Sequence, residues 1–382
     1  MVFDTPEKKR MNINLKSEEE RVNLLPDFID LREKCLSSSP KNSPNSNYYF
    51  SLLIKIWDLN SEILWAQGYW EDYLQCGEIA LDCATKLNKR DIEGRILNEL
   101  GWAQMEQEQF DIAQRCFSKS LQVFKMIGDR VGQGQSIRYM GVLHFRRHYF
   151  GLALKSYLEA LKMAQDGLKL DPLNQRLLHQ ESEIHNLLGN FYFRLWNIKA
   201  SRRELVAGLR GFRTLHKLYV APTPTSSSTP NSYSYLYFQS APLLNLGRVA
   251  MLSGQYRKAF RYFDRCDKLC QRIDRPDTRA GALFRKAELA KLQGKNEEAE
   301  ELAKEAGQIA QKEIESLQKR TQNFRFQKQG DRRKQFKAVS DKIRMVVTLS
   351  IDLLFNAPLV LLQSIGYYTL FLRAKLAAKM RR

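Results

Sequence analysis

The chain has 382 residues, of which 43% are hydrophobic and 11% aromatic, and this composition excludes a disordered protein. It carries 61 Lys and Arg against 42 Asp and Glu, and the net charge of +19 favours anionic partners such as acidic peptides, phospholipid headgroups or nucleic acid. Six cysteines are scattered without the spacing of a disulfide framework. Together these features predict a reducing, cytoplasmic location and exclude a small disulfide-rich secreted domain.

Residues 1–49 are expected to form an extension outside the main fold. The first residues, MVFDTPEKKRMNINLKSEEE, contain no apolar run of the kind found in a secretory signal. The stretch SSSPKNSPNSN at 37–47 is rich in Ser, Pro and Asn, which predicts a linker between this extension and the first helices.

The next part of the chain contains an internal repeat. Five windows align on a small residue in the first of two predicted helices, and a weaker sixth copy, SEILWAQGYWEDYLQCGEIAL, precedes them from Ser61. Twelve positions after this small residue comes Ala in every window except the third, which has Ser. Sixteen positions after the small residue, four windows have a large apolar residue. The first set is Gly101, Gly141, Gly189, Gly247 and Ala287, and the apolar set is Phe117, Tyr157, Leu205 and Phe263.

This spacing has a direct physical meaning. Two antiparallel helices approach closely only where their side chains are small, and large apolar residues fill the remaining space. One hairpin cannot bury its own apolar face, whereas a stack of hairpins can. The pattern therefore predicts an all-α stack of helix hairpins.

The windows resemble the tetratricopeptide repeat family over roughly residues 50–312. Gly101 and Gly141 are 40 residues apart, as are Gly247 and Ala287. This spacing is similar to the longer-helix arrays of adaptor proteins and bacterial signalling proteins, and LNKRDIEGRILNELG and MIGDRVGQGQSIRYMG are similar to their linker-plus-helix pattern. The resemblance implies a right-handed superhelical solenoid of about six helix hairpins. Repeats one to four would occupy 50–220, and repeats five and six 236–312.

Between these two blocks lies a segment of different composition, APTPTSSSTPNSYSY at 221–235. Because it is rich in Pro, Ser and Thr, it predicts a loop that interrupts the array.

In tetratricopeptide arrays the first helices line a concave groove that binds peptides or proteins. Asn can bond both the donor and the acceptor of an extended peptide, Arg can bind carboxylates, and aromatic residues can form apolar pockets. The mostly basic set predicts an acidic or carboxylate-bearing ligand, although each residue taken singly could be an ordinary surface residue. The family pattern places in this groove Asn98, Trp102, Arg138, Phe145, Arg146, Asn186, Asn190, Phe193, Arg194 and Arg248.

No catalytic or metal motif accompanies the repeat. His144 and His148 are four residues apart, but no H-E-x-x-H is present and no third ligand is evident. Cys266 and Cys270 are also four apart, and burial is the simpler explanation for them. We find neither a G-x-S-x-G nor a Walker-type phosphate loop. The sequence therefore predicts a protein that is not an enzyme and needs neither metal nor cofactor.

The carboxy-terminal part changes in character. A basic helix is expected at 313–345, followed by the apolar segment 346–372 and a basic end that completes 346–382. The apolar segment is long enough to cross a bilayer, although Asp352, Asn356 and Pro358 argue against one clean span. Two interpretations stay open. The tail lies in the cytoplasmic leaflet of an anionic membrane as a hairpin or interfacial helix, or it caps the last repeat. The residues expected at the membrane surface are Arg332, Arg333, Lys334, Lys337, Arg373 and Lys375.

These observations favour a non-enzymatic scaffold or adaptor that binds a peptide or protein in its groove and is localised by its tail. One alternative is a regulatory or sensor module that binds a signalling peptide, and another is a membrane-complex assembly factor. Nucleic-acid binding through the basic tail, which contains QNFRFQKQ at 322–329, is a further alternative without a recognised motif. No small-molecule substrate is expected.

Overall fold

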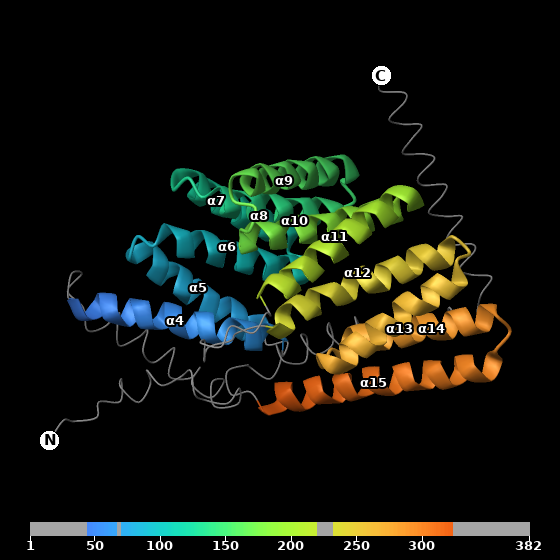
Figure 1. Cartoon of the computed structure of the whole chain (residues 1–382). Coiled ribbons are helices and arrows are strands. Elements are labelled where there is room, and N and C mark those ends of the chain that lie inside the picture. Colours follow the sequence, from blue (N-terminus) through green and yellow to red (C-terminus); the bar gives the residue numbers. More distant parts are fainter. Residues whose placement is uncertain (1–43, 67–69, 220–231, 324–382) are drawn as a thin grey trace. The chain divides into compact units, whose positions relative to one another are not determined.

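The computed structural model describes residues 44–66, 70–219 and 232–323 (Figure 1). These ranges form twelve α-helices, and no strand occurs within them. The all-α prediction is confirmed. The helices fall into two compact units. Unit 1 comprises the described residues up to Tyr149 together with 317–323, and unit 2 runs from Phe150 to Ser316. Residues 1–43 of the predicted extension, most of the predicted loop and the tail from residue 324 lie outside the described residues, and residues 44–49 of the extension are helical.

Unit 1 contains five helices, and each packs against the next along the chain. First helices of the repeats alternate with second helices, as expected for stacked hairpins. The helices are α4 (Pro44–Ala66), α5 (Trp70–Lys86), α6 (Arg90–Glu106), α7 (Phe110–Met126) and α8 (Arg130–Arg146).

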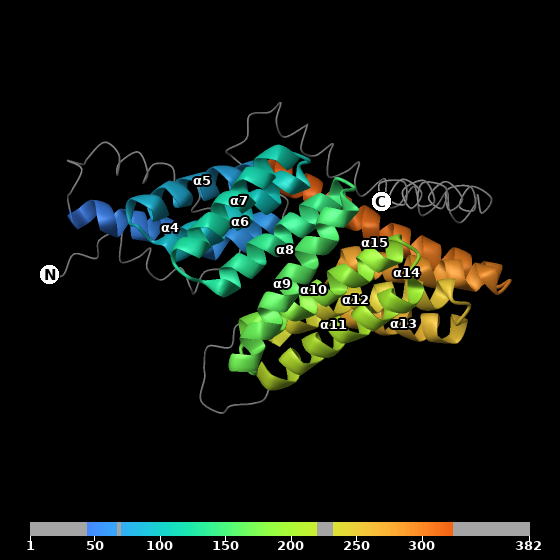
Figure 2. The same ribbon diagram turned by 90° about the horizontal axis from the view of Figure 1, so that it is seen from above.

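Unit 2 continues the same alternation. Its first helices are α10, α12 and α14, and its second helices are α9, α11, α13 and α15. Figure 2 shows α11 and α13 on the same side of α12. The helices are α9 (Phe150–Leu170), α10 (Gln175–Arg194), α11 (Ile198–Tyr219), α12 (Ser232–Leu252), α13 (Tyr256–Arg272), α14 (Pro276–Leu292) and α15 (Asn296–Asn323).

Eight turns between described helices share one backbone motif, and most of them recur at an interval of 20 residues. In each, one residue has positive φ, and the following backbone N–H donates to a carbonyl five residues back, as Gln109 does to Gln104 at 2.9 Å. This is the hydrogen bond of a Schellman motif, which ends a helix and satisfies its last carbonyls. The interval of 20 residues is half of the 40-residue spacing found in the sequence. The residues are Asn88, Glu108, Gly128 and His148 in unit 1, and Trp196, Gly254, Asp274 and Gly294 in unit 2. Trp196 is the exception to the interval, because it lies 48 residues after His148 and 58 before Gly254.

The predicted small residues lie where two helices come closest. A Cβ atom on Gly101 would lie 2.6 Å from Cε1 of Phe117, and one on Gly189 would lie 2.5 Å from Cγ of Leu205. Gly247 is closed off by the ring of Phe263 in the same way. Each pair is separated by the sixteen residues that the repeat pattern predicts. A larger side chain at these glycines would force the two helices apart.

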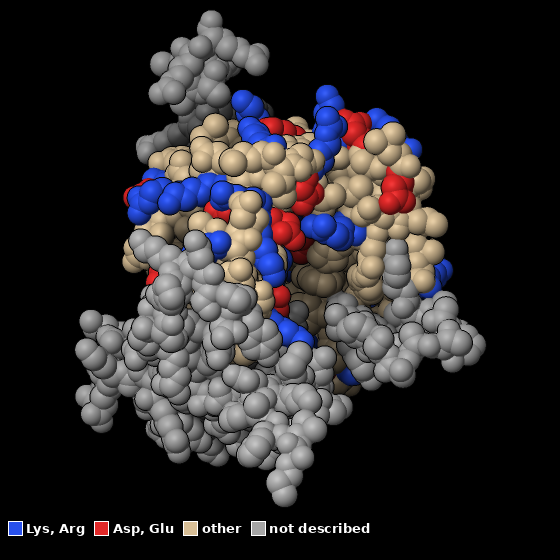
Figure 3. Space-filling model, turned by 90° about the vertical axis from the view of Figure 1, so that its left-hand side faces the viewer, with Lys and Arg blue, Asp and Glu red and all other residues tan. Residues whose placement is uncertain are grey.

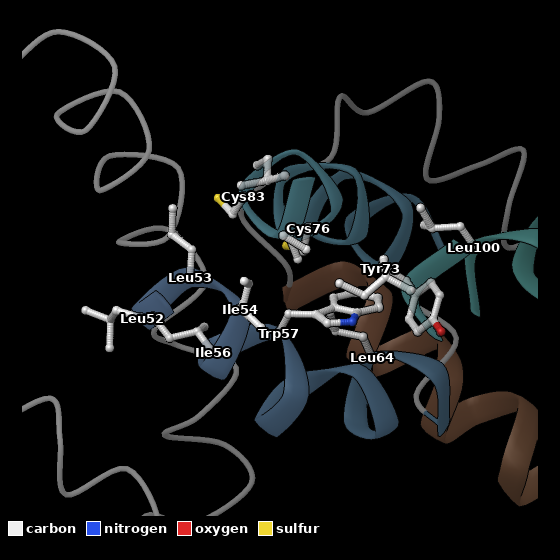
Figure 4. Close-up of a cluster of buried hydrophobic side chains, with 14 of the residues drawn as sticks. Leu52, Leu53, Ile54, Ile56, Trp57, Leu64, Tyr73, Cys76, Cys83 and Leu100 are labelled. Carbon is white, nitrogen blue, oxygen red and sulfur yellow. The ribbon is translucent and has the colours of Figure 1, made fainter. Parts of the chain in front are cut away.

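The core of unit 1 is centred on Trp57 of α4, which is 1% exposed (Figure 4). Its indole meets the ring of Tyr73 edge-on, with centroids 4.7 Å apart. Leu64 and Leu100 belong to the same apolar cluster. The hairpin α4–α5 that they hold together contains the sixth, weaker copy of the repeat.

Four of the cysteines are buried in the described helices. Cys76 and Cys83 lie in the core of unit 1, and Cys266 and Cys270 lie in that of unit 2, where both are 0% exposed. The Cys266 thiol donates to the carbonyl of Ser240 at 3.4 Å. Its contact with Cys270 and its burial raise the pKa of Cys266, so the thiol is protonated at neutral pH. These cysteines act as apolar core residues, as expected from the sequence.

Within the described ranges, no helix is both long and apolar enough to cross a membrane. The sequence-based candidate at 346–372 lies outside those ranges.

The turn motif gives a pair of opposite stability predictions. Glu108→Gly should raise the free energy of unfolding by up to about 1 kcal/mol, because glycine adopts positive φ without strain. Gly128→Ala should lower it by about 1 kcal/mol, because no atom lies within 4 Å of the added methyl group and only the backbone is strained. Thermal and urea unfolding followed by circular dichroism would measure both. Equal effects of the same sign would contradict this account of the turns.

A second prediction concerns the ion pair between α10 and α11. Glu204 accepts a hydrogen bond from His185 at 2.7 Å, and this bond, followed by that from Arg203, lowers the pKa of Glu204 below its ordinary 4.5. The stabilisation is therefore complete above about pH 4.5 and is lost as the pH falls through the lower folded value. Glu204→Gln should flatten the dependence of unfolding free energy on pH between about pH 5 and 3. An unchanged acid dependence in this variant would show that other carboxyl groups control it.

Candidate ligand-binding face

The first helices of unit 2 form the face that is richest in predicted groove residues. α12 packs against both α10 and α14, so the outward side chains of the three helices share one face. α10 contributes Asn186, Asn190, Phe193 and Arg194, and α12 contributes Arg248. The structure thus brings the five predicted residues of unit 2 onto one set of neighbouring helices.

Arg248 is the central cation of this face. Its guanidinium lies 4.5 Å from the ring centroid of Phe193 on α10, and its Nη1 donates to Asn245 Oδ1 at 3.3 Å. The side chain is half-buried. It forms no ion pair with any residue in the described ranges. Its guanidinium is thus held by a neutral amide and an aromatic ring, and not by a carboxylate.

The surroundings of Arg248 disfavour its positive charge. Burial, together with repulsion by Arg285 and Arg194, lowers its pKa to about 10, while Glu288 opposes the shift in part. Arg248 still carries its proton at neutral pH. An anion that binds beside it would therefore relieve both the loss of solvation and the repulsion.

A second arginine of this face comes from α14. Arg285 Nη1 lies 2.6 Å from Glu288 Oε2, and the two residues are three positions apart on the helix. Among the described residues, Glu288 is the one carboxylate that influences the pKa of Arg248, and the two arginines Arg285 and Arg194 act against it. The face therefore has an excess of positive charge where its helices meet.

The asparagines of α10 add amide groups to the face. Asn186, Asn190 and Phe193 follow one another at intervals of four and three, which places them on one side of the helix. Asn186 Oδ1 is buried and accepts no hydrogen bond from a described residue. Such an atom loses its solvation without compensation, and a ligand that donates a hydrogen bond would satisfy it.

In unit 1 the predicted groove residue Arg146 already has partners within the protein. Arg146 forms an ion pair with Glu106, and its Nη1 donates to the Met105 carbonyl at 3.3 Å. It also lies 6.0 Å from the ring centroid of Trp102. Arg146 therefore ties α8 to α6. Phe145 is half-buried on the same helix.

Two further residues of unit 1 are too deeply buried for surface recognition. Asn98 is 1% exposed and donates to the Ser136 hydroxyl at 3.1 Å. Arg138 is 7% exposed, and its guanidinium lies 4.6 Å from the ring centroid of Tyr139. Because neither side chain reaches the surface, both are omitted from the candidate site.

Other charges in unit 1 are also neutralised locally. Arg95 bonds Asp58 at 2.5 Å and Glu99 at 3.2 Å, and Glu99 also accepts from the Trp57 indole. Figure 3 looks from the side where α4–α7 lie in Figure 1 and shows basic and acidic side chains interspersed there. On the side that Figure 3 shows, the described charges are therefore mixed.

The sequence-based prediction of the groove missed Asn245, Arg285 and Glu288. The repeat register contained the signal. Asn245 lies two positions before Gly247, Arg285 two before Ala287, and Glu288 one after it. The position one after the small residue also gave Trp102, Asn190 and Arg248, whereas the position two before it gave none of the predicted residues.

The predicted membrane-surface residues, Arg332, Arg333, Lys334, Lys337, Arg373 and Lys375, lie outside the described residues. Within the described ranges, no three His, Cys, Asp or Glu side chains cluster in a way that could hold a metal ion. His148 is one of the residues with positive φ, in the turn after α8.

No protein-family model matches the sequence, and no curated protein matches it.

Solved structures do match. A Rap protein crystallised with Competence and Sporulation Factor has a TM-score of 0.50 at 12% identity, and the match covers 96% of this chain and 99% of that one. The apo form of RapI has a TM-score of 0.49 at 13% identity, covering 86% and 99% of the two chains. The apo quorum sensor NprR from B. thuringiensis has 0.46 at 15% identity, covering 93% and 97%. The likeness to the Rap complex concerns the fold, and this chain has the helical-repeat fold of tetratricopeptide type.

Proposed function

We propose that this protein is a non-enzymatic adaptor or sensor that binds an anionic group of a peptide or protein on the α10, α12 and α14 face of unit 2. The observation that carries the proposal is Arg248, a half-buried cation without an ion pair in the described ranges and with its pKa lowered to about 10. Core stability does not explain such a residue, because an apolar side chain there would avoid the cost of burying a charge. A ligand carboxylate would offset that cost.

A polypeptide ligand fits this face better than a small anion does. Phe193 offers apolar contact beside Arg248, and Asn186 and Asn190 offer amides that can bond a peptide backbone. Arg248 and Arg285 come from two helices and can approach a carboxylate from two directions. The Rap protein, which shares this fold, was crystallised with Competence and Sporulation Factor, and this supports a bound signalling partner as the sensor version of the proposal.

Adaptor and sensor differ in the consequence of binding. A sensor changes the accessibility of its tail when the ligand binds, whereas an adaptor need not do so. Limited proteolysis near Lys334 in the presence and absence of a selected peptide separates the two.

The composition of the tail supports a second proposal, attachment to a membrane through residues 346–372. Alkaline carbonate extraction of membranes from cells that express the full chain tests it. Release of the intact protein into the soluble fraction would contradict an integral attachment.

The two arginines with contrasting surroundings give a stability prediction. Arg248→Met should leave the unfolding free energy unchanged or raise it by up to about 1 kcal/mol, because it removes a buried charge that lacks a partner. Arg146→Met should lower it by about 1–2 kcal/mol, because α8 loses its ion pair and its backbone hydrogen bond to α6. Urea unfolding measures both. A large loss of stability in Arg248→Met would show that Arg248 is structural and would remove the main support for a binding role.

The binding prediction uses a displayed library of random peptides with free carboxyl termini. Selection on the full chain should enrich peptides with Asp, Glu or an exposed terminal carboxylate. Arg248→Met and Arg285→Met should each weaken the best peptide by about tenfold or more, since each removes a charge-assisted hydrogen bond. Arg257→Met, an exposed arginine on α13, is the matched control and should leave the affinity unchanged. Enrichment without acidic groups, or equal losses in all three variants, would refute the proposal.

A further inference from the structure

The second helices of unit 2 carry a feature that groove binding does not use. α11 has six basic side chains against one acidic side chain. At 100° per residue, all six fall within about 100° of the helix circumference. They run from one end of the helix to the other, about 27 Å apart at 1.5 Å per residue. The six are Lys199, Arg202, Arg203, Arg210, Arg213 and Lys217.

α13 repeats the arrangement. Its six basic side chains also fall within about 100° of the circumference. All six are exposed, and so are five of the six on α11, with Arg213 half-buried. The six are Arg257, Lys258, Arg261, Arg265, Lys268 and Arg272. The inner side of each helix is buried, so cations are expected on the outward side, and the feature of these two helices is how few acids share it.

The two rows belong to one surface. Arg265 of α13 is close enough to lower the pKa of Arg213 on α11, after the larger effect of burial. The two rows, defined by the residues named above, are called the cationic surface. It joins α11 to α13 on the side of unit 2 formed by second helices.

Few carboxylates compensate this charge. Glu204 is 7% exposed and pairs with His185 and with Arg203 of the same row, and Asp267 is 6% exposed and is bound by Arg279 and Lys286. Asp264 remains at the surface and pairs with Lys268. The cationic surface therefore stays strongly positive despite the acids in its own two helices.

The cationic surface is bordered by buried apolar residues, by exposed aromatic residues and by an acidic helix. The apolar sides of both helices are turned inward, where Leu205, Leu209 and Phe263 are buried. Tyr256 and Phe260 of α13 remain 40% and 42% exposed beside the cations. The next second helix, α15, begins with four exposed acids, Glu297, Glu298, Glu300 and Glu301, so the positive charge ends at α13.

We propose that the cationic surface docks unit 2 on an anionic phospholipid membrane. The outward positions of the two rows hold almost only cations, with few amides or hydroxyls to fix the register of a folded partner or to read bases. A fluid leaflet needs no such register, because its headgroups move to the cations. Exposed aromatic side chains at the edge suit the polar–apolar boundary of a bilayer. This docking needs neither the tail nor the ligand face on the first helices.

The test measures how strongly the full chain partitions onto vesicles of phosphatidylcholine alone and of phosphatidylcholine with about one third phosphatidylserine. Binding through the apolar tail contributes to both compositions, so the ratio of the two partition coefficients isolates the anionic part. The wild-type ratio should be well above one. It should fall as salt is raised, because dissolved ions screen attraction between exposed charges more than about 10 Å apart at 0.1 M salt.

A matched pair of triple variants locates the contact. Arg210→Glu, Arg257→Glu and Arg261→Glu together should lower the ratio at least about a hundredfold. The control is Arg115→Glu, Lys119→Glu and Lys125→Glu on α7 of unit 1, which changes the net charge equally. All six residues are exposed, and none forms an ion pair in the described ranges. The control should retain most of the wild-type ratio, and circular dichroism checks that both variants fold.

Three outcomes would overturn the proposal. A wild-type ratio near one would exclude anionic docking, and equal losses in the two triples would reduce the effect to net charge. Displacement from the vesicles by a single-stranded oligonucleotide that binds the same surface more tightly would identify nucleic acid as the partner. If the Glu triple fails to fold, the milder Arg210→Gln, Arg257→Gln and Arg261→Gln triple keeps the comparison valid. Peptide binding by Arg248 should persist in all of these variants, which separates this inference from the proposed function.

Discussion

The whole arrangement depends on how closely two antiparallel helices can approach. At Gly101, Gly189 and Gly247 the missing side chain lets the partner helix place Phe117, Leu205 or Phe263 directly over the backbone. Turns with one residue of positive φ then return the chain, most of them at an interval of 20 residues, so first and second helices alternate. That regular alternation separates two kinds of surface, one built from first helices and one from second helices. Both proposals made for unit 2 follow from this separation.

The two surfaces bear positive charge in different ways. On the first helices, Arg248 is half-buried beside Phe193, so its charge is poorly solvated and suits one discrete anion. On the second helices, the cations are exposed and spread over two helices, so each is well solvated and acts mainly through the summed field. Burial thus distinguishes a site for one group from a surface for many, even where both consist of arginines.

Much of the fold could be predicted from sequence because its determinants are local. The spacing between Gly101 and Phe117 indicates which residues touch, and a repeat that recurs five times makes the interpretation secure. The site was harder to predict. The repeat register gives the position of a residue on its helix, but it does not reveal neighbours on other helices. Asn98 and Arg146 occupy groove positions, yet one is bound to Ser136 in the core and the other to Glu106. Such pairings depend on side chains some 40 residues away, which no single window contains.

The buried cysteines allow the opening of each unit to be measured by the rate at which a thiol reagent labels them. Cys76 and Cys83 are shielded in unit 1, and Cys266 and Cys270 in unit 2, so a thiol reagent can reach them only when the surrounding helices open. The labelling rate of each pair, read by mass spectrometry, would therefore give the opening free energy of each unit in the same sample. Ligand binding to α10, α12 and α14 would slow the labelling of Cys266 and Cys270. The fraction of protein with bound ligand could therefore be followed without a dye and without a substitution.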